Sequence, residues 1–454
     1  MSAPDPRREF AVDVVSRLRE KGFEALWAGG CVRDFLLGKT PKDYDVATNA
    51  TPDAVRRLFG PKRTVPVGAA FGVIMVLGPS KEAGQVEVAT FRSEGPYLDG
   101  RRPSNVAFST AEQDAQRRDF TINGMFYDPL DARVIDYVGG EADLARGVLR
   151  AIGNPIDRMT EDKLRMLRAV RFAATLEFEF DEATRAAVRG MAPQIHVVSA
   201  ERIAQELRRM LVDARRRRAM ELAADVGLIP EIFPELRVES IKKVPATPQA
   251  AEPSGCGVAG RSSWSATLQM LHLLQEPTFE LAFAALVHRA AESPAFPQDG
   301  GEPILQFQSD RRHKGDAVWS ICRRLKLSNE ESEAITWLVA QRHSLRNAPH
   351  MKLSELKRKL SHPLSPALIE LFRVETLAHG GDLTPVAFSQ DYLRNTPLEV
   401  LDPPPLLGGN DLKALGVAPG PAFKEWLDNV RDAQLNGDVS TREEALAWIR
   451  SSLG

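Results

Sequence analysis

The stretch LWAGGCVRDFLLGKTPKDYDVAT, residues 26–48, decides the fold of the first part of the chain. Its beginning predicts a short buried strand over 25–28, a turn at Gly29 and Gly30, and a helix that opens within 32–37. Glycine lets the backbone approach a ligand closely, and a helix start offers unpaired N–H groups to an anion. The segment is therefore typical of a phosphate-binding turn.

A second strand is predicted over 42–47, and it carries two carboxylates. Because side chains alternate along a strand, Asp43 and Asp45 share one face while Tyr44 points to the other. Carboxylate oxygens are the ligands that Mg²⁺ uses while it also holds substrate phosphates. Either feature alone is more often plain turn chemistry or a solvated loop, but their order and compactness favour a nucleotidyltransferase site.

This segment closely resembles a known family. GGCVRDFLLG followed by DYDVAT is similar to the opening motif of the class II tRNA nucleotidyltransferases (CCA-adding enzymes) and bacterial poly(A) polymerases, members of the polymerase-beta nucleotidyltransferase superfamily. The resemblance implies that Gly29, Gly30 and Arg33 contact a triphosphate and that Asp43 and Asp45 hold two metal ions. It also implies an α+β head with a small mixed sheet, followed by an all-helical neck, body and tail.

A second motif, RRDFTING at 117–124, matches the family's RRDFTxN at the same place relative to the first. Two solvated arginines at a helix start are the ordinary explanation of such a run. The resemblance implies instead that Arg118 meets phosphate, that Asp119 and Asn123 place the ribose and triphosphate, and that Asp119 contacts the 2′-hydroxyl. Short apolar runs over 73–77 and 86–90 predict two adjacent antiparallel strands. Glu87, on the second of them, is either a solvent-facing glutamate or a third acidic group near the metal ions.

A third motif, EDKLRMLRAVRFA at 161–173, resembles the element with which this family selects the incoming base. Alternating acidic and basic side chains on a helix usually form solvent-exposed ion pairs that only stabilise the helix slightly, and this is the alternative explanation of the motif. The three-residue spacing places Asp162, Arg165 and Arg168 on one helix face. By the resemblance, Asp162 and Arg165 read the Watson–Crick edge of C or A, whose exocyclic amine stands where U and G carry a carbonyl. Such a contact discriminates by about 1–3 kcal/mol.

A fourth match, SAERIAQEL at 199–207, is explained by helix capping and packing. The arginines that follow it, Arg208, Arg209, Arg215 and Arg216, form the best local basic patch. This patch suits either the phosphates of a tRNA acceptor stem or a plain solvated helix face.

The 454-residue chain has a formal charge of −2, so nucleic acid would have to be met by local basic stripes. The three cysteines are too scattered for a disulfide framework or a zinc site, which suggests a reducing cytoplasm. No stretch has the length and apolarity of a signal peptide or membrane span. Composition predicts a head over 1–143, a helical neck and body over 144–237, a flexible linker over 238–263 and a helical tail over 264–454.

The tail contains a near-match to another domain. WSATL at 264–268 and AALVHR at 284–289 resemble the WxHTL and AALLHD pieces of an HD phosphohydrolase domain. Ala266 and Arg289 stand where that domain has metal ligands, so a metal ion cannot be held. The tail is therefore predicted to be a degenerate HD-like domain used for RNA binding or packing. A turn-rich loop over 95–104 and a further break over 293–303 are also predicted.

Together these patterns predict an enzyme that adds C and A to the 3′ end of tRNA, using CTP, ATP and Mg²⁺, with no membrane or protein partner. The stretch VGAAFGV at 67–73 replaces the GRRFRL-like stretch usual in poly(A) polymerases of this class, which favours CCA addition. Within the family, the alternative is an A-adding enzyme or a poly(A) polymerase. The alternative from another class is an RNA-binding relative without catalytic activity.

Overall fold

The computed structural model describes residues 5–68, 72–94, 106–236, 263–290, 316–415 and 421–453. The chain forms two compact units, the first of 1–210 with 218–234 and the second of 211–217 with 235–454. No helix in the described ranges is long and apolar enough to cross a membrane. The predicted loop over 95–104, the break over 293–303 and the linker over 238–263 (apart from residue 263) lie outside the described residues.

A seven-stranded mixed sheet forms the centre of the head, as predicted, in the order β3-β4-β5-β2-β1-β8-β9. Its neighbouring strands are antiparallel except for β2 and β5, which are parallel. The strands are β1 Ala25–Ala28, β2 Asp45–Thr48, β3 Thr64–Gly68, β4 Val73–Leu77, β5 Gln85–Thr90, β8 Phe126–Asp128 and β9 Arg133–Ile135. The predicted antiparallel pair at 73–77 and 86–90 is confirmed as β4 and β5.

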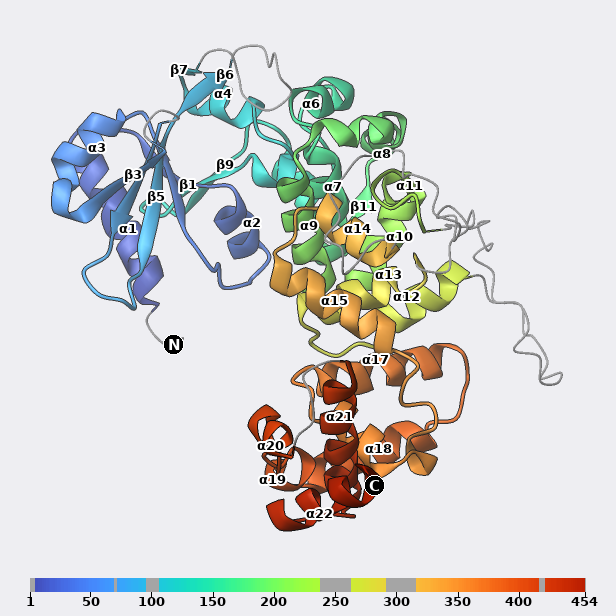
Figure 1. Ribbon diagram of the computed structural model, residues 1–454. Coiled ribbons are helices and arrows are strands. Elements are labelled where there is room, and N and C mark those ends of the chain that lie inside the picture. Colours follow the sequence, from blue (N-terminus) through green and yellow to red (C-terminus); the bar gives the residue numbers. More distant parts are fainter. Residues whose placement is uncertain are drawn as a thin grey trace. The chain divides into compact units, whose positions relative to one another are not determined.

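Helices cover this sheet. α1 buries Val14, Val15 and Leu18, and it lies with α3 on one side of the sheet (Figure 1). α4 packs Ala111 and Ala115 into a core cluster with Leu26, Ala28 and Ala47 of β1 and β2. The helices of the head are α1 Pro6–Glu20, α2 Gly30–Leu36, α3 Pro52–Phe59, α4 Ala111–Gln116 and α5 Gly140–Arg146, with short 3₁₀ turns η1 Pro61–Arg63 and η3 Thr121–Asn123.

The rest of the first unit is helical, as predicted, apart from two strands of two residues, β10 Val148–Leu149 and β11 Glu179–Phe180, which pair in parallel. A further antiparallel pair, β6 Arg92–Glu94 and β7 Val106–Phe108, stands beside the main sheet. The helices are α6 Pro155–Glu161, α7 Arg165–Leu176, α8 Glu182–Met191, α9 Ala200–Val212, α10 Arg216–Asp225 and α11 Leu228–Ile232, with η4 Ala192–Val197.

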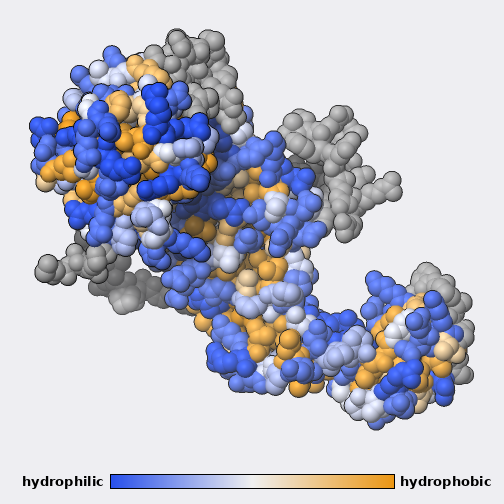
Figure 2. Space-filling model, turned by 90° about the vertical axis from the view of Figure 1, so that its left-hand side faces the viewer, coloured by the Kyte–Doolittle hydropathy of each residue, from blue (hydrophilic) through white to orange (hydrophobic). Residues whose placement is uncertain are grey.

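The second unit is all-helical in its described ranges. Its last helices close a small core around Leu412, Ala445 and Ile449. Its helices are α12 Ser263–Leu273, α13 Phe279–Val287, α14 Ala317–Arg324, α15 Asn329–Gln341, α16 Leu353–Leu360, α17 Ser365–Ala378, α18 Thr384–Asn395, α19 Leu398–Leu401, α20 Gly409–Ala414, α21 Pro421–Asn436 and α22 Arg442–Leu453, with η6 Ala348–His350. Hydrophilic residues cover most of the face seen in Figure 2, with apolar residues in small patches.

Candidate active site

The glycine turn has the predicted place, between β1 and α2. Gly29 has φ 76°, a conformation that favours glycine, and α2 begins directly at Gly30. A Cβ atom added to Gly29 would lie 3.0 Å from Nη1 of Arg118. The absence of a side chain at Gly29 therefore serves two purposes, because it permits the turn and leaves room for the guanidinium.

The sheet brings two of the predicted acidic residues together. Asp45 begins β2, and Glu87 is its register partner on the parallel strand β5. Partners in register project to the same side of a sheet. Asp43 lies in the bend before β2, because the strand begins at Asp45 rather than at the predicted residue 42. The predicted alternation still holds in burial, since Asp43 and Asp45 are exposed while Tyr44 between them is buried.

Asp45 is electrostatically strained in the protein without ligands. Partial removal from water and the neighbouring Glu87 carboxylate raise its pKa to about 6, and Asp43 acts in the same direction. Arg118 opposes the shift. A carboxylate that repels its neighbours in this way is stabilised by a bound cation.

The donor set fits a metal ion that shares its coordination with a substrate. Within the described ranges no group of three His, Cys, Asp or Glu side chains is gathered as a closed metal cage. Mg²⁺ usually keeps several waters and takes one or two carboxylates plus substrate phosphates. Asp45 with Glu87 or Asp43 provides that number of oxygen ligands.

Arg118 is held at this place by a buried carboxylate that was not predicted as a site residue. Asp114 of α4 accepts from Nε and Nη2 of Arg118 at 3.1 and 2.9 Å, and from Nε and Nη2 of Arg117 at 2.9 and 2.6 Å. Burial would raise the pKa of Asp114, but the two arginines outweigh it and hold the pKa below its ordinary value. An acidic residue four positions before an arginine on a helix is the sequence signal that could have found it.

The second motif forms one continuous chain of hydrogen bonds. Arg33 Nη1 donates to Asn123 Oδ1 at 2.8 Å, and Asn123 Nδ2 donates to Asp119 Oδ1 at 3.1 Å. Arg168 of α7 donates to Asp119 Oδ2 through Nε and Nη2 at 2.9 and 2.6 Å. The sequence motifs around residues 33, 119–123 and 168 therefore meet, although they come from α2, η3 and α7.

This chain restricts what Asp119 can do. Burial would raise its pKa, yet Arg168 and Asn123 hold the pKa below its ordinary value. Oδ1 also accepts from the Phe120 N–H at 2.8 Å, so two bonds reach each carboxylate oxygen. A carboxylate has about four acceptor positions, so a ribose hydroxyl would have to displace one of these partners. The geometry favours Asp119 as the residue that orients Asn123 and Arg168.

The residues predicted to select the base are not arranged on one helix face, so that part of the prediction is wrong. Asp162 ends α6 with an extended backbone, and α7 begins only at Arg165. Asp162 accepts the Leu164 N–H at 3.0 Å, which starts the new helix, so the chain turns there instead of continuing. Arg165 is 8% exposed and donates to Glu161 Oε2 at 2.6 Å.

Arg202 of α9, for which only capping and packing were expected, holds Asp162. Its Nη1 and Nη2 atoms donate to the two carboxylate oxygens of Asp162 at 3.2 and 2.6 Å. This pair joins the third and fourth sequence motifs across 40 residues. No local sequence pattern signals a contact of that separation.

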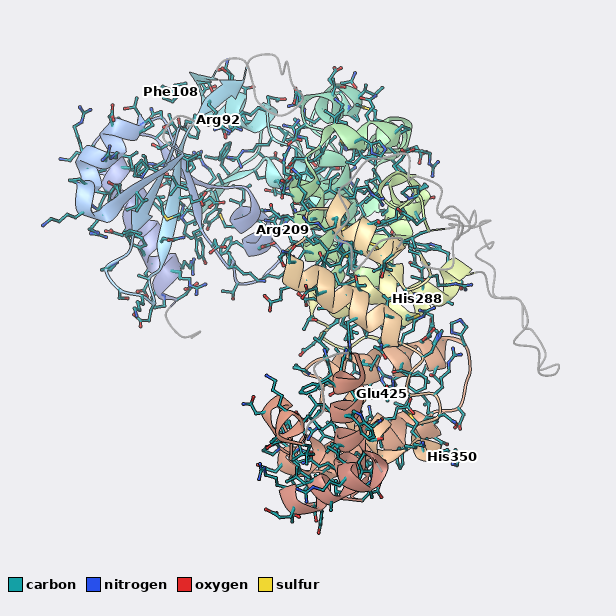
Figure 3. The ribbon with its side chains drawn as sticks, in the orientation of Figure 1. Arg92, Phe108, Arg209, His288, His350 and Glu425 are labelled. Carbon is teal, nitrogen blue, oxygen red and sulfur yellow. The ribbon has the colours of Figure 1, made fainter. Side chains whose placement is uncertain are left out.

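One member of the predicted RNA-binding patch is buried. Arg216 is 4% exposed, and its guanidinium donates to the carbonyls of Leu211 and Leu274, both at 2.8 Å. It therefore stabilises helix ends and is not presented to RNA. Arg209 (labelled in Figure 3) and Arg215 are exposed, and Arg208 is partly exposed.

Comparisons with known proteins agree with this geometry. Residues 25–150 match the model "Poly A polymerase head domain" and residues 177–239 match "Probable RNA and SrmB- binding site of polymerase A". A CCA-adding enzyme of Enterococcus faecalis is 43% identical over 207 residues, or 45% of this chain and 50% of that protein. Poly(A) polymerase I of Salmonella typhimurium is 42% identical over 240 residues, half of each chain. The chain thus spans about half the length of these two relatives.

Two further matches extend over nearly the whole chain. A CCA-adding enzyme of Leuconostoc mesenteroides is 28% identical over 440 residues, or 96% of this chain and 94% of that protein. The crystal structure of the Bacillus stearothermophilus CCA-adding enzyme in complex with CTP superposes with a TM-score of 0.71 at 25% identity, covering 100% of this chain and 98% of the other.

The sheet, the glycine turn and the carboxylates on adjacent strands define the head as a nucleotidyltransferase domain. Such domains typically work with metal ions. Residues 25–150 and 177–239 therefore match two domain families of the poly(A) polymerases, and the chain as a whole is similar to CCA-adding enzymes.

Proposed function

We propose that the protein adds C and A residues to the 3′ end of tRNA, without a nucleic-acid template, from CTP and ATP. The observation that carries the proposal is the placement of Asp45 and Glu87 as register partners on parallel strands, with Arg118 acting on the same carboxylate. Support for the substrates comes from the near full-length likeness to CCA-adding enzymes, one of them solved with CTP.

In this reaction the 3′-hydroxyl of the RNA attacks the α-phosphate and pyrophosphate leaves. Asp43, Asp45 and, as a third group, Glu87 would hold Mg²⁺. When bound there, Mg²⁺ would lower the pKa of the attacking hydroxyl and neutralise the charge of the triphosphate. No covalent intermediate is needed, since positioning and charge neutralisation supply most of the rate in phosphoryl transfer.

The protein's own groups position the nucleotide. Gly29 and Gly30 let the triphosphate approach the start of α2, and Arg118, oriented by Asp114, neutralises phosphate charge. Asn123, fixed between Arg33 and Asp119, contacts the sugar and phosphate side of the nucleotide.

Base selection is proposed for the segment after the head. Asp162 accepts from the exocyclic amine of C or A, Arg165 donates to a ring acceptor, and Arg168 completes this surface while it is paired with Asp119. Arg208, Arg209 and Arg215 are the proposed contacts to RNA phosphates. These roles assign catalysis to 1–143, base selection and RNA contact to 144–237, and an accessory role to 264–454. We infer a cytoplasmic location from the proposed substrates tRNA, CTP and ATP.

The test uses one tRNA in two forms, lacking CCA or ending in CC, with Mg²⁺ and with CTP and ATP singly and together. Growth of the first form by three nucleotides and of the second by one is expected. An Asp45→Ala variant should lose extension and keep tRNA binding. If the wild-type protein binds both RNAs and extends neither, the catalytic proposal is wrong.

The same assay separates the relatives. The likeness to a Salmonella poly(A) polymerase makes poly(A) synthesis the second candidate. A long ladder with ATP alone would establish that activity, and extension only of the CC-ended form would establish an A-adding enzyme.

A further inference from the structure

A cavity of about 520 Å³ lies in the second unit, away from every residue assigned above. The ends of α13, α15 and α17 and the start of α18 form its walls, and Figure 3 labels His288, which follows α13. Its volume falls within the range of about 300–1,000 Å³ that is typical of small-molecule sites. The cavity includes Arg289, one of the two positions at which the HD-like sequence has lost a metal ligand.

The charges around this cavity favour an anionic ligand. Arg289 and Arg346 line it, together with Glu375 and Asp382. Glu375 already pairs with two residues through its Oε1 atom. His343 Nε2 lies 2.8 Å from this oxygen and Arg342 Nε lies 3.8 Å from it. Because Glu375 is already paired with His343 and Arg342, Asp382 is the remaining lining carboxylate that balances Arg289 and Arg346. Guanidinium groups bind phosphate oxygens with matching fork geometry.

A metal ion does not suit the cavity. The described residues contain no group of three His, Cys, Asp or Glu side chains placed to hold one. A positively charged guanidinium beside His288 would also repel a cation.

Two buried acceptors in the cavity wall require a hydrogen-bond donor. His288 is 1% exposed, and its Nδ1 donates to the Ala285 carbonyl at 2.9 Å, which leaves Nε2 as an acceptor. Burial lowers the pKa of His288 to about 4, so the ring is neutral at physiological pH. Neither His288 Nε2 nor Glu375 Oε2 has a hydrogen-bond partner in the described structure. Buried polar atoms are rarely left in that state.

We propose that this cavity binds a mononucleotide, with its phosphate at Arg289 and Arg346 and its base amine directed to His288 and Glu375. Phe372 and Pro385 supply the apolar wall for the base. A free nucleotide and a nucleotide within an RNA chain share this chemistry. The site is independent of nucleotide addition in the head, and it needs no metal ion.

The test locates bound nucleotide in the full-length protein. 8-Azido-AMP is photo-crosslinked in EDTA, and labelled peptides are mapped. We expect label within 279–290 or 365–390, reduced at least tenfold in the double variant R289Q/R346Q. The matched control R323Q/R394Q changes two other arginines of the same unit, on α14 and α18. Inosine monophosphate, which lacks the amine, should compete at least tenfold less well than AMP.

Affinity for tRNA distinguishes the two sources. If the cavity takes a free nucleotide, R289Q/R346Q loses labelling by AMP and binds tRNA as the control does. If it takes a nucleotide of an RNA chain, the same variant binds tRNA at least tenfold more weakly. Label confined to the head, with unchanged tRNA affinity, overturns the proposal. Equal competition by inosine monophosphate overturns the assigned role of the two acceptors. Tm values of both double variants identify any loss of folding.

Discussion

At the scale of single residues, Gly29 is tied both to the backbone turn and to Arg118. Its φ of 76° strains any other residue, and an added Cβ atom would meet Nη1 of Arg118 at 3.0 Å. Gly29→Ala should therefore displace the guanidinium, with a loss of about 1–2 kcal/mol in stability and at least tenfold in kcat/KM.

Gly38 provides a matched control for this prediction. It has φ 71°, but nothing lies within 4 Å of an added Cβ atom. Gly38→Ala should cost similar backbone strain and leave kcat/KM near that of the wild type. Equal kinetic losses in the two variants, with equal unfolding free energies, would show that the contact with Arg118 is unimportant.

Asp45 should make stability depend on pH. Its raised pKa, about 6, means that the folded state binds the proton more tightly than the unfolded state. Ionisation above pH 6 therefore destabilises the fold, and the penalty disappears as the pH falls to about 4. Asp45→Asn removes this penalty. Because solvent screens the exposed side chain, we expect the free energy of unfolding to rise by only about 1 kcal/mol at pH 7.5 and by about zero at pH 4.

Urea denaturation in EDTA at the two pH values measures this difference. Asp13→Asn, at an exposed carboxylate of α1, is the control and should change stability little at either pH. A gain for Asp45→Asn that is the same at pH 4 and pH 7.5 would contradict the electrostatic explanation.

Arg202 should act on base choice through Asp162. The Leu164 N–H and Arg202 occupy three acceptor positions of the Asp162 carboxylate, which leaves about one for an exocyclic amine. Arg202→Gln frees the carboxylate to rotate. We expect the ratio of kcat/KM for CTP to that for UTP to fall about tenfold or more, which corresponds to roughly 1–3 kcal/mol of lost discrimination.

Arg209 lies on the same helix and pairs with Glu206 at 2.9 Å, so Arg209→Gln is the control for selectivity. Arg202→Lys should restore part of the ratio. A purely structural role for Arg202 would lower both kcat/KM values by the same factor.

At the scale of helices and strands, much of the head could be predicted because its signals are local. Alternating apolar residues gave β4 and β5, and the Gly-Gly turn gave the β1–α2 junction. What escaped prediction depends on distant partners. Arg202 of α9 pairs with Asp162 across 40 residues, which no local pattern signals. The role of Arg216 was missed because two of its acceptors, the carbonyls of Leu271 and Leu274, lie in α12 and just beyond it.

The start of α10 offers a direct comparison of neighbouring arginines. Arg216 is buried and bonded to carbonyls at helix ends, whereas Arg215 is exposed. Arg216→Met should reduce stability by about 2 kcal/mol and leave the charge presented to RNA unchanged. Arg215→Met should leave stability within about 0.5 kcal/mol and weaken tRNA binding at low salt.

Denaturant melts and filter binding at two salt concentrations measure these effects. Equal loss of tRNA affinity in both variants, with both folded, would contradict the division of roles.

At the scale of the whole molecule, the two units are not consecutive along the chain. Residues 211–217 belong to the second unit although residues on both sides belong to the first. A fragment ending at residue 236 therefore keeps Arg216 and loses the Leu271 and Leu274 carbonyls. We expect faster amide hydrogen exchange over 211–217 in this fragment than in the full chain. The sheet strands β1 and β5 serve as internal reference, and equal exchange over 211–217 would show that the segment is stable without the second unit.

The same feature fixes an order of events during synthesis. Arg216 and its acceptor Leu274 are 58 residues apart. At about 5–20 residues per second, roughly 3–12 s separate the two on the ribosome. During that interval the head can complete its sheet and the α7 contacts, because these use residues already made. The junction of α9 and α10 is translated early, but Arg216 gains its Leu274 acceptor only after α12 has emerged. We therefore expect a pause between residues 216 and 274 to leave a folded head in which this junction lacks its stabilising hydrogen bonds.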